Sequence, residues 1–238
     1  MSIFSTLAQL FRDFAATGAE AIDAIVERVR SAYSGDRETR RRVAFSVAMI
    51  ALSAKMAKAD GVVSQREIRA FQEIFKIPPE EVGNVFRLYD LARRDTAGFE
   101  IYAAKMRGLC DGGPGNCALL GDVLDGLFHI AGADDTIHER ELEFLARVAE
   151  IFGMTEAEFE RVKARHVQSG PEGAFAVLGV RPTDPPEVIR RRYLELVKEN
   201  HPDRLAARGV PDEFMAIATE RMKAINAAWS LVGRVAMT

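Results

Sequence analysis

A ten-residue pattern that occurs twice constrains the fold of this chain more than any other feature of its sequence. The first copy, ADGVVSQREI, covers residues 59–68, and the second, ADDTIHEREL, covers 133–142, an offset of 74 residues. An apolar segment of helical period precedes each copy, at 43–58 and 117–131, and an amphipathic segment follows each one. The repeat therefore predicts two related helical hairpins that bury their apolar faces against each other, because neither has enough core alone.

The rest of the chain also shows the period of helices, without the alternation or the β-branched clusters typical of strands. We therefore predict an all-α protein with short connections. The pair Gly170-Pro171 ends the repeat region and marks a domain boundary. This divides the chain into an N-terminal amphipathic segment at 1–35, a helical domain at 36–168 and a C-terminal domain at 171–238.

The segment at 1–35 carries three phenylalanines, Phe4, Phe11 and Phe14, on one helical face. Two interpretations stay open: this face packs on the protein itself, or it makes peripheral contact with a membrane surface. A membrane span is not predicted, because the longest mainly apolar run without charge covers only residues 43–54, whereas a span needs about 20 residues.

Charge and cysteine content narrow the functional class. The 32 basic and 35 acidic side chains give a net charge of −3, so the basic excess typical of proteins that bind nucleic acid is missing. Cys110 and Cys117 are the two cysteines, too few for a disulfide framework in a chain of this length. We expect two free thiols and a reducing, cytoplasmic location.

Acidic residues recur at matching places in the two copies of the repeat. Carboxylate oxygens are the ligands that calcium and magnesium prefer. The candidate metal ligands are therefore Asp60, Glu67, Asp134 and Glu141. Their spacing does not match a calcium-binding loop, which needs alternate acidic or amide residues before a glycine and a glutamate.

Helix capping explains the same acidic turns without a metal. In a capping box, a Ser or Thr hydroxyl accepts a hydrogen bond from the backbone three residues on, and a glutamate there reaches back. Ser64 and Glu67 fit this pattern in the first copy, and Thr136 and Glu139 fit it in the second. We therefore assign no cofactor, and a divalent metal stays the alternative.

The tripeptide His201-Pro202-Asp203 lies between two segments of helical period, at 187–200 and 212–232. Antiparallel packing of these helices would leave the tripeptide exposed at their tip. Pro202 fixes its own φ angle and disfavours helix at His201, so the turn presents an imidazole and a carboxylate in a set geometry. Such stiffness reduces the entropy lost on binding and suits a recognition element.

The repeat resembles the TerB-like domain, an all-helical fold. The resemblance covers residues 36–168 and rests on the twin A-D-G/D-x-[VI]-x-x-x-E pattern on helical hairpins. The acidic residues of that family have been suspected of binding divalent metal, and this implication falls on the four carboxylates named above.

Residues 171–238 resemble the J-domain of DnaJ-type co-chaperones. The landmarks, in order, are a short helix ending at Gly179, Ile189-x-x-x-Tyr193-x-x-Leu196, the tripeptide and Ile225-Asn226-Ala227-Ala228-Trp229. A TerB-like domain followed by a J-domain resembles the DjlA-like co-chaperones. The best-known members of that group begin with a membrane-spanning helix, which this sequence does not predict.

The resemblance implies a co-chaperone that docks on a DnaK-type heat-shock ATPase and stimulates its ATP hydrolysis. His201, Pro202 and Asp203 would be essential for docking, and the helix before them would offer a basic face to an acidic partner. The candidates for that face are Arg190, Arg191, Lys198 and Arg204. Leu194 and Glu195 replace basic residues that are usual in the family, which weakens the face.

The TerB-like domain would supply specificity for a client such as an unfolded protein, for another partner, or for a location. The alternative is a metal- or stress-sensing helical interaction module in which the J-domain is secondary. We do not expect an enzyme, because His201 and Asp203 could form an acid/base pair but no nucleophile or pocket signature accompanies them.

Overall fold

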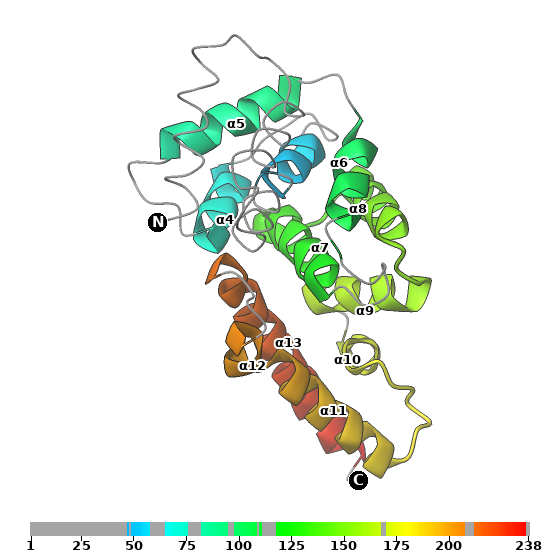
Figure 1. Ribbon diagram of the computed structural model, residues 1–238. Helices are drawn as coiled ribbons and strands as arrows, with labels where there is room; N and C mark the ends of the chain where they lie inside the picture. Colours follow the sequence, from blue (N-terminus) through cyan, green and yellow to red (C-terminus); the bar gives the residue numbers. More distant parts are fainter. Residues whose placement is uncertain are drawn as a thin grey trace.

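The computed structural model describes residues 47, 49–57, 65–75, 82–94, 98–108, 110, 118–167, 170–207 and 212–236. These residues contain helices and turns and no strand, which confirms the all-α prediction (Figure 1). The N-terminal segment at 1–35, including its three phenylalanines, lies outside the described residues. After a helix over 47–57, the labelled helices are α4 (Gln65–Phe75), α5 (Val82–Arg94), α6 (Phe99–Arg107), α7 (Ala118–Ala131), α8 (Glu139–Phe152), α9 (Glu156–His166), α10 (Gly170–Leu178), α11 (Pro186–Asn200), α12 (Pro202–Ala207) and α13 (Asp212–Ala236).

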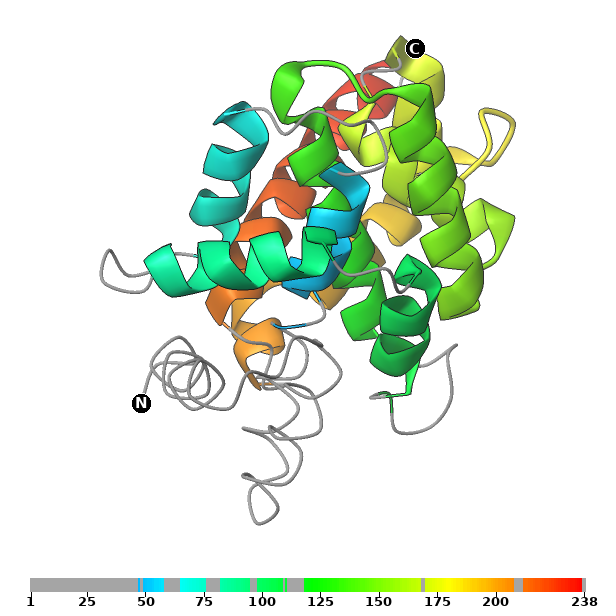
Figure 2. The ribbon, with the colours of Figure 1, turned by 90° about the horizontal axis from the view of Figure 1, so that it is seen from above.

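The two copies of the repeat form two helical hairpins, as predicted. The helix over 47–57 and α4 make the first, and α7 and α8 make the second, with the 3-10 turn η3 (Gly132–Asp134) after α7. The helix over 47–57 lies inside the bundle, between α4 and the pair α6 and α8 (Figures 1 and 2). All of its described side chains are buried. The helix therefore lacks the polar, solvent-facing side of an amphipathic helix.

The amphipathic helices cover this inner layer with one apolar face each. Phe71 and Ile74 of α4 and Leu145 and Val148 of α8 are buried in a single core cluster with α7. The solvent-facing side of the same helices is charged, for example at Arg147 of α8. The spacing of apolar residues in each copy therefore selects the face that packs inward.

The second copy has a helix cap, as predicted, but other residues than Thr136 and Glu139 form it. The first residue before α8 is His138, whose backbone N–H donates to Oε2 of Glu141 over 2.8 Å. Thr136 instead donates its hydroxyl to the carbonyl of Asp134, and Glu139 is exposed in the first turn. Asp135 has φ of 67°, a left-handed turn that moves the start of the helix two residues past Thr136.

The expectation of two free thiols is also wrong. Cys110, the cysteine within the described residues, is disulfide-bonded. The argument for a reducing compartment loses this support, since disulfides persist in oxidising environments.

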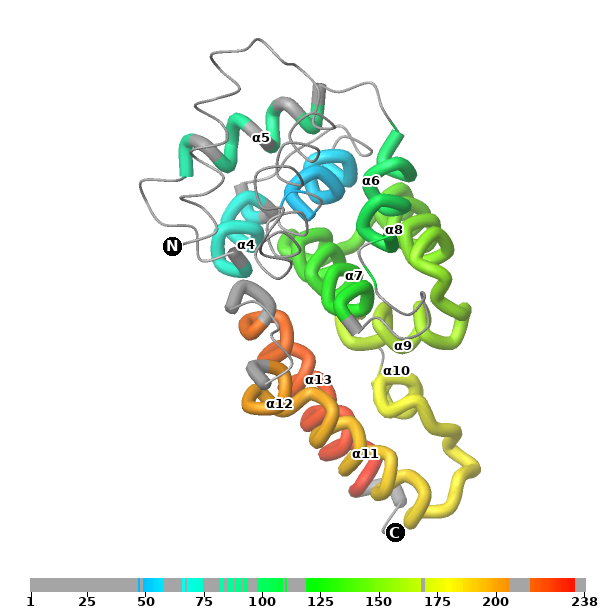
Figure 3. The backbone as a smooth tube through the Cα atoms, in the orientation of Figure 1, coloured from blue at the N-terminus to red at the C-terminus, as the bar shows by residue number. Residues whose placement is uncertain are grey.

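The C-terminal helices have a core of their own. Phe175 and Leu178 of α10, Ile189 of α11 and Ile225 and Val232 of α13 belong to this second cluster. The tube in Figure 3 shows α11 and α13 running side by side, with α12 at one end of the pair. This is the antiparallel hairpin that the sequence predicts.

An aromatic stack joins the two long helices of this hairpin. The rings of Tyr193 on α11 and Trp229 on α13 have centroids 4.7 Å apart and planes 9° from parallel. The Tyr193 hydroxyl also donates to Oδ1 of Asn226 over 3.1 Å. Such an aromatic pair stabilises the hairpin beyond the area that it buries, and it fixes the register of one helix against the other.

The hairpin packs against the bundle. One end of α13 contacts α4, α7 and α9, and α10 contacts α9. Ile217 of α13 is buried in the first core cluster, close to the backbone of Gly126 on α7, where an added Cβ would lie 2.8 Å from the Ile217 side chain. The missing side chain at Gly126 thus lets α13 approach α7 closely.

Candidate functional site: an exposed His-Pro-Asp turn above a buried ionic network

The tripeptide lies at the junction of α11 and α12. His201 follows the last residue of α11 with φ of −63° and ψ of 132°, and Pro202 opens α12. Proline suits this first helical position because its missing N–H would have no partner there. The backbone N–H groups of Arg204 and Leu205 donate to the His201 carbonyl over 3.0 and 3.1 Å, which fixes the turn.

The imidazole and the carboxylate face each other and are accessible. The backbone N–H of Asp203 donates to Nδ1 of His201 over 3.2 Å, and the same nitrogen lies 3.7 Å from Oδ2 of Asp203. The side chains are 53% exposed for His201 and 92% exposed for Asp203. The turn therefore presents both groups to a partner without further rearrangement.

The residue before the tripeptide is buried and tied down. Asn200 donates its amide to the carbonyl of Leu196 over 2.7 Å and accepts from Nη1 of Arg221 over 3.0 Å. Only 7% of Asn200 is exposed. The position of His201 is thus set by a polar contact between α11 and α13.

Arg221 is the centre of a buried ionic network between α13 and the bundle. Its Nε donates to Oδ2 of Asp125 over 2.6 Å, and Nη2 donates to Oδ1 of Asp122. Nη1 of Arg165 on α9 lies 2.5 Å from the same Oδ2 of Asp125, and Nε2 of His166 lies 3.0 Å from Oδ1. Two carboxylates and two guanidinium groups balance each other's charge here, as burial of ions requires.

The pKa values of the two carboxyl groups move in opposite directions. Burial would raise the pKa of Asp125, but the charges of Arg165 and Arg221 and the hydrogen bond with His166 outweigh burial and hold it well below its usual range. For Asp122, burial prevails over the attraction of Arg221, and the pKa is raised. Asp125 is therefore the ionic anchor of the network.

The four basic residues of the predicted docking face are all exposed. Arg190, Arg191 and Lys198 lie on α11, and Arg204 lies on α12 beside the tripeptide. Leu194 lies among them on α11, with 52% of its surface exposed. Arg192 faces another direction, is 26% exposed, and pairs with Glu195 over 3.1 Å.

The candidate metal ligands are not brought together by the described residues. Asp60 lies outside them, and Glu67 lies in α4 but its side chain is among those not described. Asp134 belongs to η3, and Glu141 is buried as the cap of α8. Within the described ranges, no group of three His, Cys, Asp or Glu side chains could hold a metal ion. The assignment of no cofactor stays a prediction, and a divalent metal stays its alternative.

Sequence reasoning did not find the buried network. One signal for it was present: Asp122 and Asp125 are two acidic residues inside the otherwise apolar helix α7. Charged residues are almost never fully buried without a partner, so each of them required one. That partner, Arg221, is 96 residues from Asp125, and no local pattern identifies it.

The fold and the site together define a class of protein: an all-α bundle of paired helical hairpins that carries a further hairpin with an exposed His-Pro-Asp turn. The chain belongs to the family of the tellurite resistance protein TerB, whose model matches residues 46–164. This match covers the two hairpins of the repeat and ends within α9.

Several curated relatives carry the description "Co-chaperone protein DjlA". The protein from Photobacterium profundum is 28% identical over 218 residues, which covers 81% of this chain and 78% of the relative. The protein from Haemophilus influenzae is 26% identical and covers 82% of this chain and 81% of the relative. The protein from Escherichia coli K12 is 33% identical over 125 residues, and the match spans 46% of its length. No solved structure matches the chain significantly.

None of the described helices combines the length and the hydropathy that crossing a bilayer requires.

Proposed function

We propose that this protein is a DnaJ-type co-chaperone that docks on a DnaK-type heat-shock ATPase through His201, Pro202 and Asp203 and stimulates ATP hydrolysis. The homology to DjlA co-chaperones along most of the chain supports this role. The ATPase performs the chemistry, and this chain contributes a docking surface and no catalytic step.

The observation that carries the proposal is the presentation of the tripeptide. An imidazole and a carboxylate are exposed at the tip of a helical hairpin, on a turn whose backbone is fixed by hydrogen bonds to the His201 carbonyl. Arg204 lies beside it, and Arg190, Arg191 and Lys198 are exposed along α11. A rigid, basic recognition element fits an acidic docking surface and gives fast association by electrostatic steering.

The TerB domain would supply the second half of the function: it would bring a client, another protein or a location to the ATPase. Its firm packing on the hairpin through Ile217 and Arg221 supports a role in which the two domains act as one body. A client held by the bundle would then stand at a fixed distance from the docking turn.

The test is single-turnover ATP hydrolysis by the DnaK-type ATPase of the same cell, with and without the full chain. Wild type should stimulate hydrolysis, and His201→Gln should abolish the stimulation while leaving the helical circular dichroism unchanged. His138→Gln is the matched control, because His138 is also exposed and caps α8 through its backbone N–H. Absence of stimulation by folded wild type, or equal stimulation by His201→Gln, contradicts the proposal.

A further inference from the structure

A second feature lies between the domains, below the docking turn. It is a cavity of about 550 Å³ lined by α7 and α9 of the TerB domain and by α11, α12 and α13 of the hairpin. Its size is in the range of pockets that hold small ligands. Neither domain forms it alone.

The wall of this cavity has an excess of positive charge. Six cationic side chains line it, against three carboxylates. Asp122 is already paired with Arg221, and Glu195 and Glu199 both pair with Arg192. The cations of the wall are Arg161, Arg165, Arg192, Lys198, Arg204 and Arg221.

Three of these cations have no carboxylate partner among the described residues. The side chains of Arg161, Lys198 and Arg204 make no hydrogen bond or ion pair with any of them. Lys198 and Arg204 are exposed, so water can solvate them, but Arg161 is partly buried. Its Nε atom is fully buried without an acceptor, and Nε of Arg165 in the same wall is in the same condition.

The environment of Arg161 lacks a compensating anion. Burial and the positive charge of Arg192 both lower the pKa of Arg161, and the attraction of Glu158 and Glu199 does not offset them. Glu158 is engaged as the cap of α9, where it accepts from the backbone N–H of Thr155 over 2.8 Å. The charge of the Arg161 guanidinium group is therefore left without a bound carboxylate, and an anionic ligand in the cavity would supply the opposite charge.

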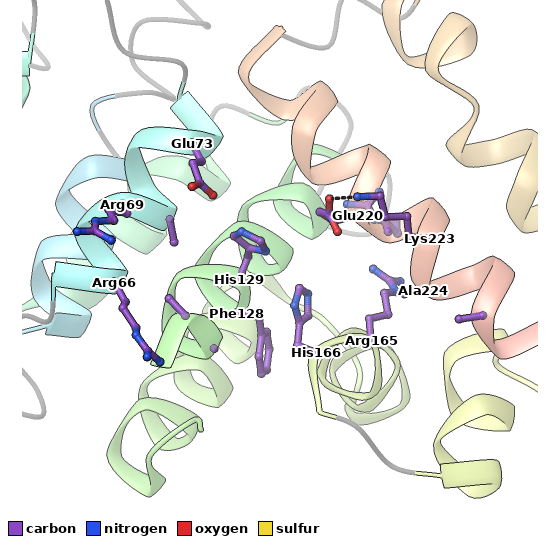
Figure 4. Close-up of a pocket in the computed structure, with 15 residues that line it drawn as sticks. Arg66, Arg69, Glu73, Phe128, His129, Arg165, His166, Glu220, Lys223 and Ala224 are labelled. Carbon is purple, nitrogen blue, oxygen red and sulfur yellow. Dashed lines mark hydrogen bonds and ion pairs between the residues drawn. The ribbon is translucent and has the colours of Figure 1, made fainter. Parts of the chain in front are cut away.

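A neighbouring cavity has a wall in which most of the cations are paired with carboxylates. It lies between α4, α7, α9 and α13 and also contains several basic residues (Figure 4). There, Arg66 pairs with Asp135 over 3.0 Å, and Lys223 pairs with Glu220 over 2.7 Å. Arg165 reaches from this wall to Asp125. Arg66, Lys223 and Arg165 thus have carboxylate partners in that cavity, whereas the side chains of Arg69 there and of Arg161 have none among the described residues.

We propose that the cavity between α9 and α11 binds the phosphate group of a small phosphorylated molecule or of free phosphate. Guanidinium groups match the oxygens of phosphate through pairs of parallel hydrogen bonds, and the two arginines without a carboxylate partner, Arg161 and Arg204, line this cavity from α9 and α12. A compact, multiply charged anion suits cations that line one cavity from different helices.

The test is isothermal titration calorimetry on the full chain at constant ionic strength, with inorganic phosphate, pyrophosphate and ADP as separate probes. Binding by at least one probe at low millimolar concentration or below supports the site, and the strongest probe distinguishes free phosphate from a phosphorylated molecule. Arg161→Gln should weaken that binding about tenfold or more, because it removes charge-assisted hydrogen bonds. Arg204→Gln should have the same effect and serves if Arg161→Gln folds poorly.

Arg140→Gln is the matched control, since Arg140 is an exposed arginine on α8. Its replacement changes the net charge by the same amount as Arg161→Gln does. It should bind the probe as wild type does. Lack of binding by all three probes would overturn the proposal, and so would equal weakening by Arg140→Gln, which indicates general attraction to a basic surface. An acidic peptide that binds where the phosphates do not would also overturn it.

Occupation of the cavity has one consequence for docking. Lys198 and Arg204 line the cavity and also belong to the proposed docking face. A phosphate ligand would therefore compete with the ATPase for these two cations. This consequence rests on the proposed function, whereas the calorimetric test does not involve the ATPase, so the two can fail separately.

Discussion

Nη1 of Arg221 lies 3.0 Å from Oδ1 of Asn200, the residue immediately before His201. The same guanidinium group binds Asp122 and Asp125 in the TerB domain. One side chain thus connects the core helix of the bundle with the root of the docking turn. Because the network is buried and each charge has a partner, it holds both elements in one geometry.

Removal of the Arg221 charge should strongly destabilise the protein. Arg221→Met keeps much of the side-chain volume but leaves Asp122 buried without its cation, and breaking such a pair costs about 3–5 kcal/mol. The midpoint of urea unfolding, followed by circular dichroism, measures this loss. Lys223→Met is the control, because the Lys223–Glu220 pair is exposed and should contribute little. Equal midpoints for the two variants would contradict the role of Arg221.

Replacement of Asn200 should impair docking without touching the tripeptide. Asn200→Ala removes the acceptor of Arg221 Nη1 and the donor to Leu196, so His201 loses its support. We expect the concentration for half-maximal ATPase stimulation to rise roughly fivefold, which corresponds to about 1 kcal/mol for one hydrogen bond. Asn226→Ala, which removes an exposed acceptor of Tyr193, is the matched control and should change it less. If Asn200→Ala leaves the concentration for half-maximal stimulation unchanged, Asn200 does not position the docking turn.

The unfolding free energy should decrease as the pH falls from about 8 to about 5, the range in which histidine titrates. Burial, with the nearby His166, lowers the pKa of His129 below 6.5, so the unfolded chain binds its proton first. Where the unfolded state binds more protons, stability rises with pH. His129→Gln should flatten this dependence in urea unfolding at several pH values. A slope equal to that of wild type would show that His129 does not titrate on unfolding.

The sequence predicts the hairpins and the docking turn but not the contact between them. Periodicity and repetition are local, so α4, α8 and α11 follow from the spacing of their apolar residues. The partner of Asp125 depends on how α13 docks on α7, which is a tertiary event. The predicted cap of α8, Thr136, lies two residues before the observed one, His138. The reason is that Asp135 adopts a left-handed conformation that extends the turn.

Glu141 should act as a helix cap. Glu141→Gln weakens the hydrogen bond from the His138 backbone N–H and removes a charge that favours the helix N-terminus, so about 0.5–2 kcal/mol should be lost. Glu139→Gln is the matched control, since Glu139 is exposed in the same turn. Thermal unfolding in the presence of EDTA measures both. A difference in stability between wild type and Glu141→Gln that appears only when calcium or magnesium is present would favour the metal interpretation instead.

Finally, the two domains should unfold together. Trp229 is the only tryptophan and lies in the hairpin, so its fluorescence reports on that domain, whereas far-UV circular dichroism reports on all helices. The Arg221 network and Ile217 couple the hairpin to the bundle, and coincident transitions by the two probes are expected for wild type. In Arg221→Met the fluorescence transition should move to lower urea than the circular dichroism transition, because the hairpin loses its anchor while the bundle keeps its core. Separate transitions in wild type would show that the two domains are not coupled.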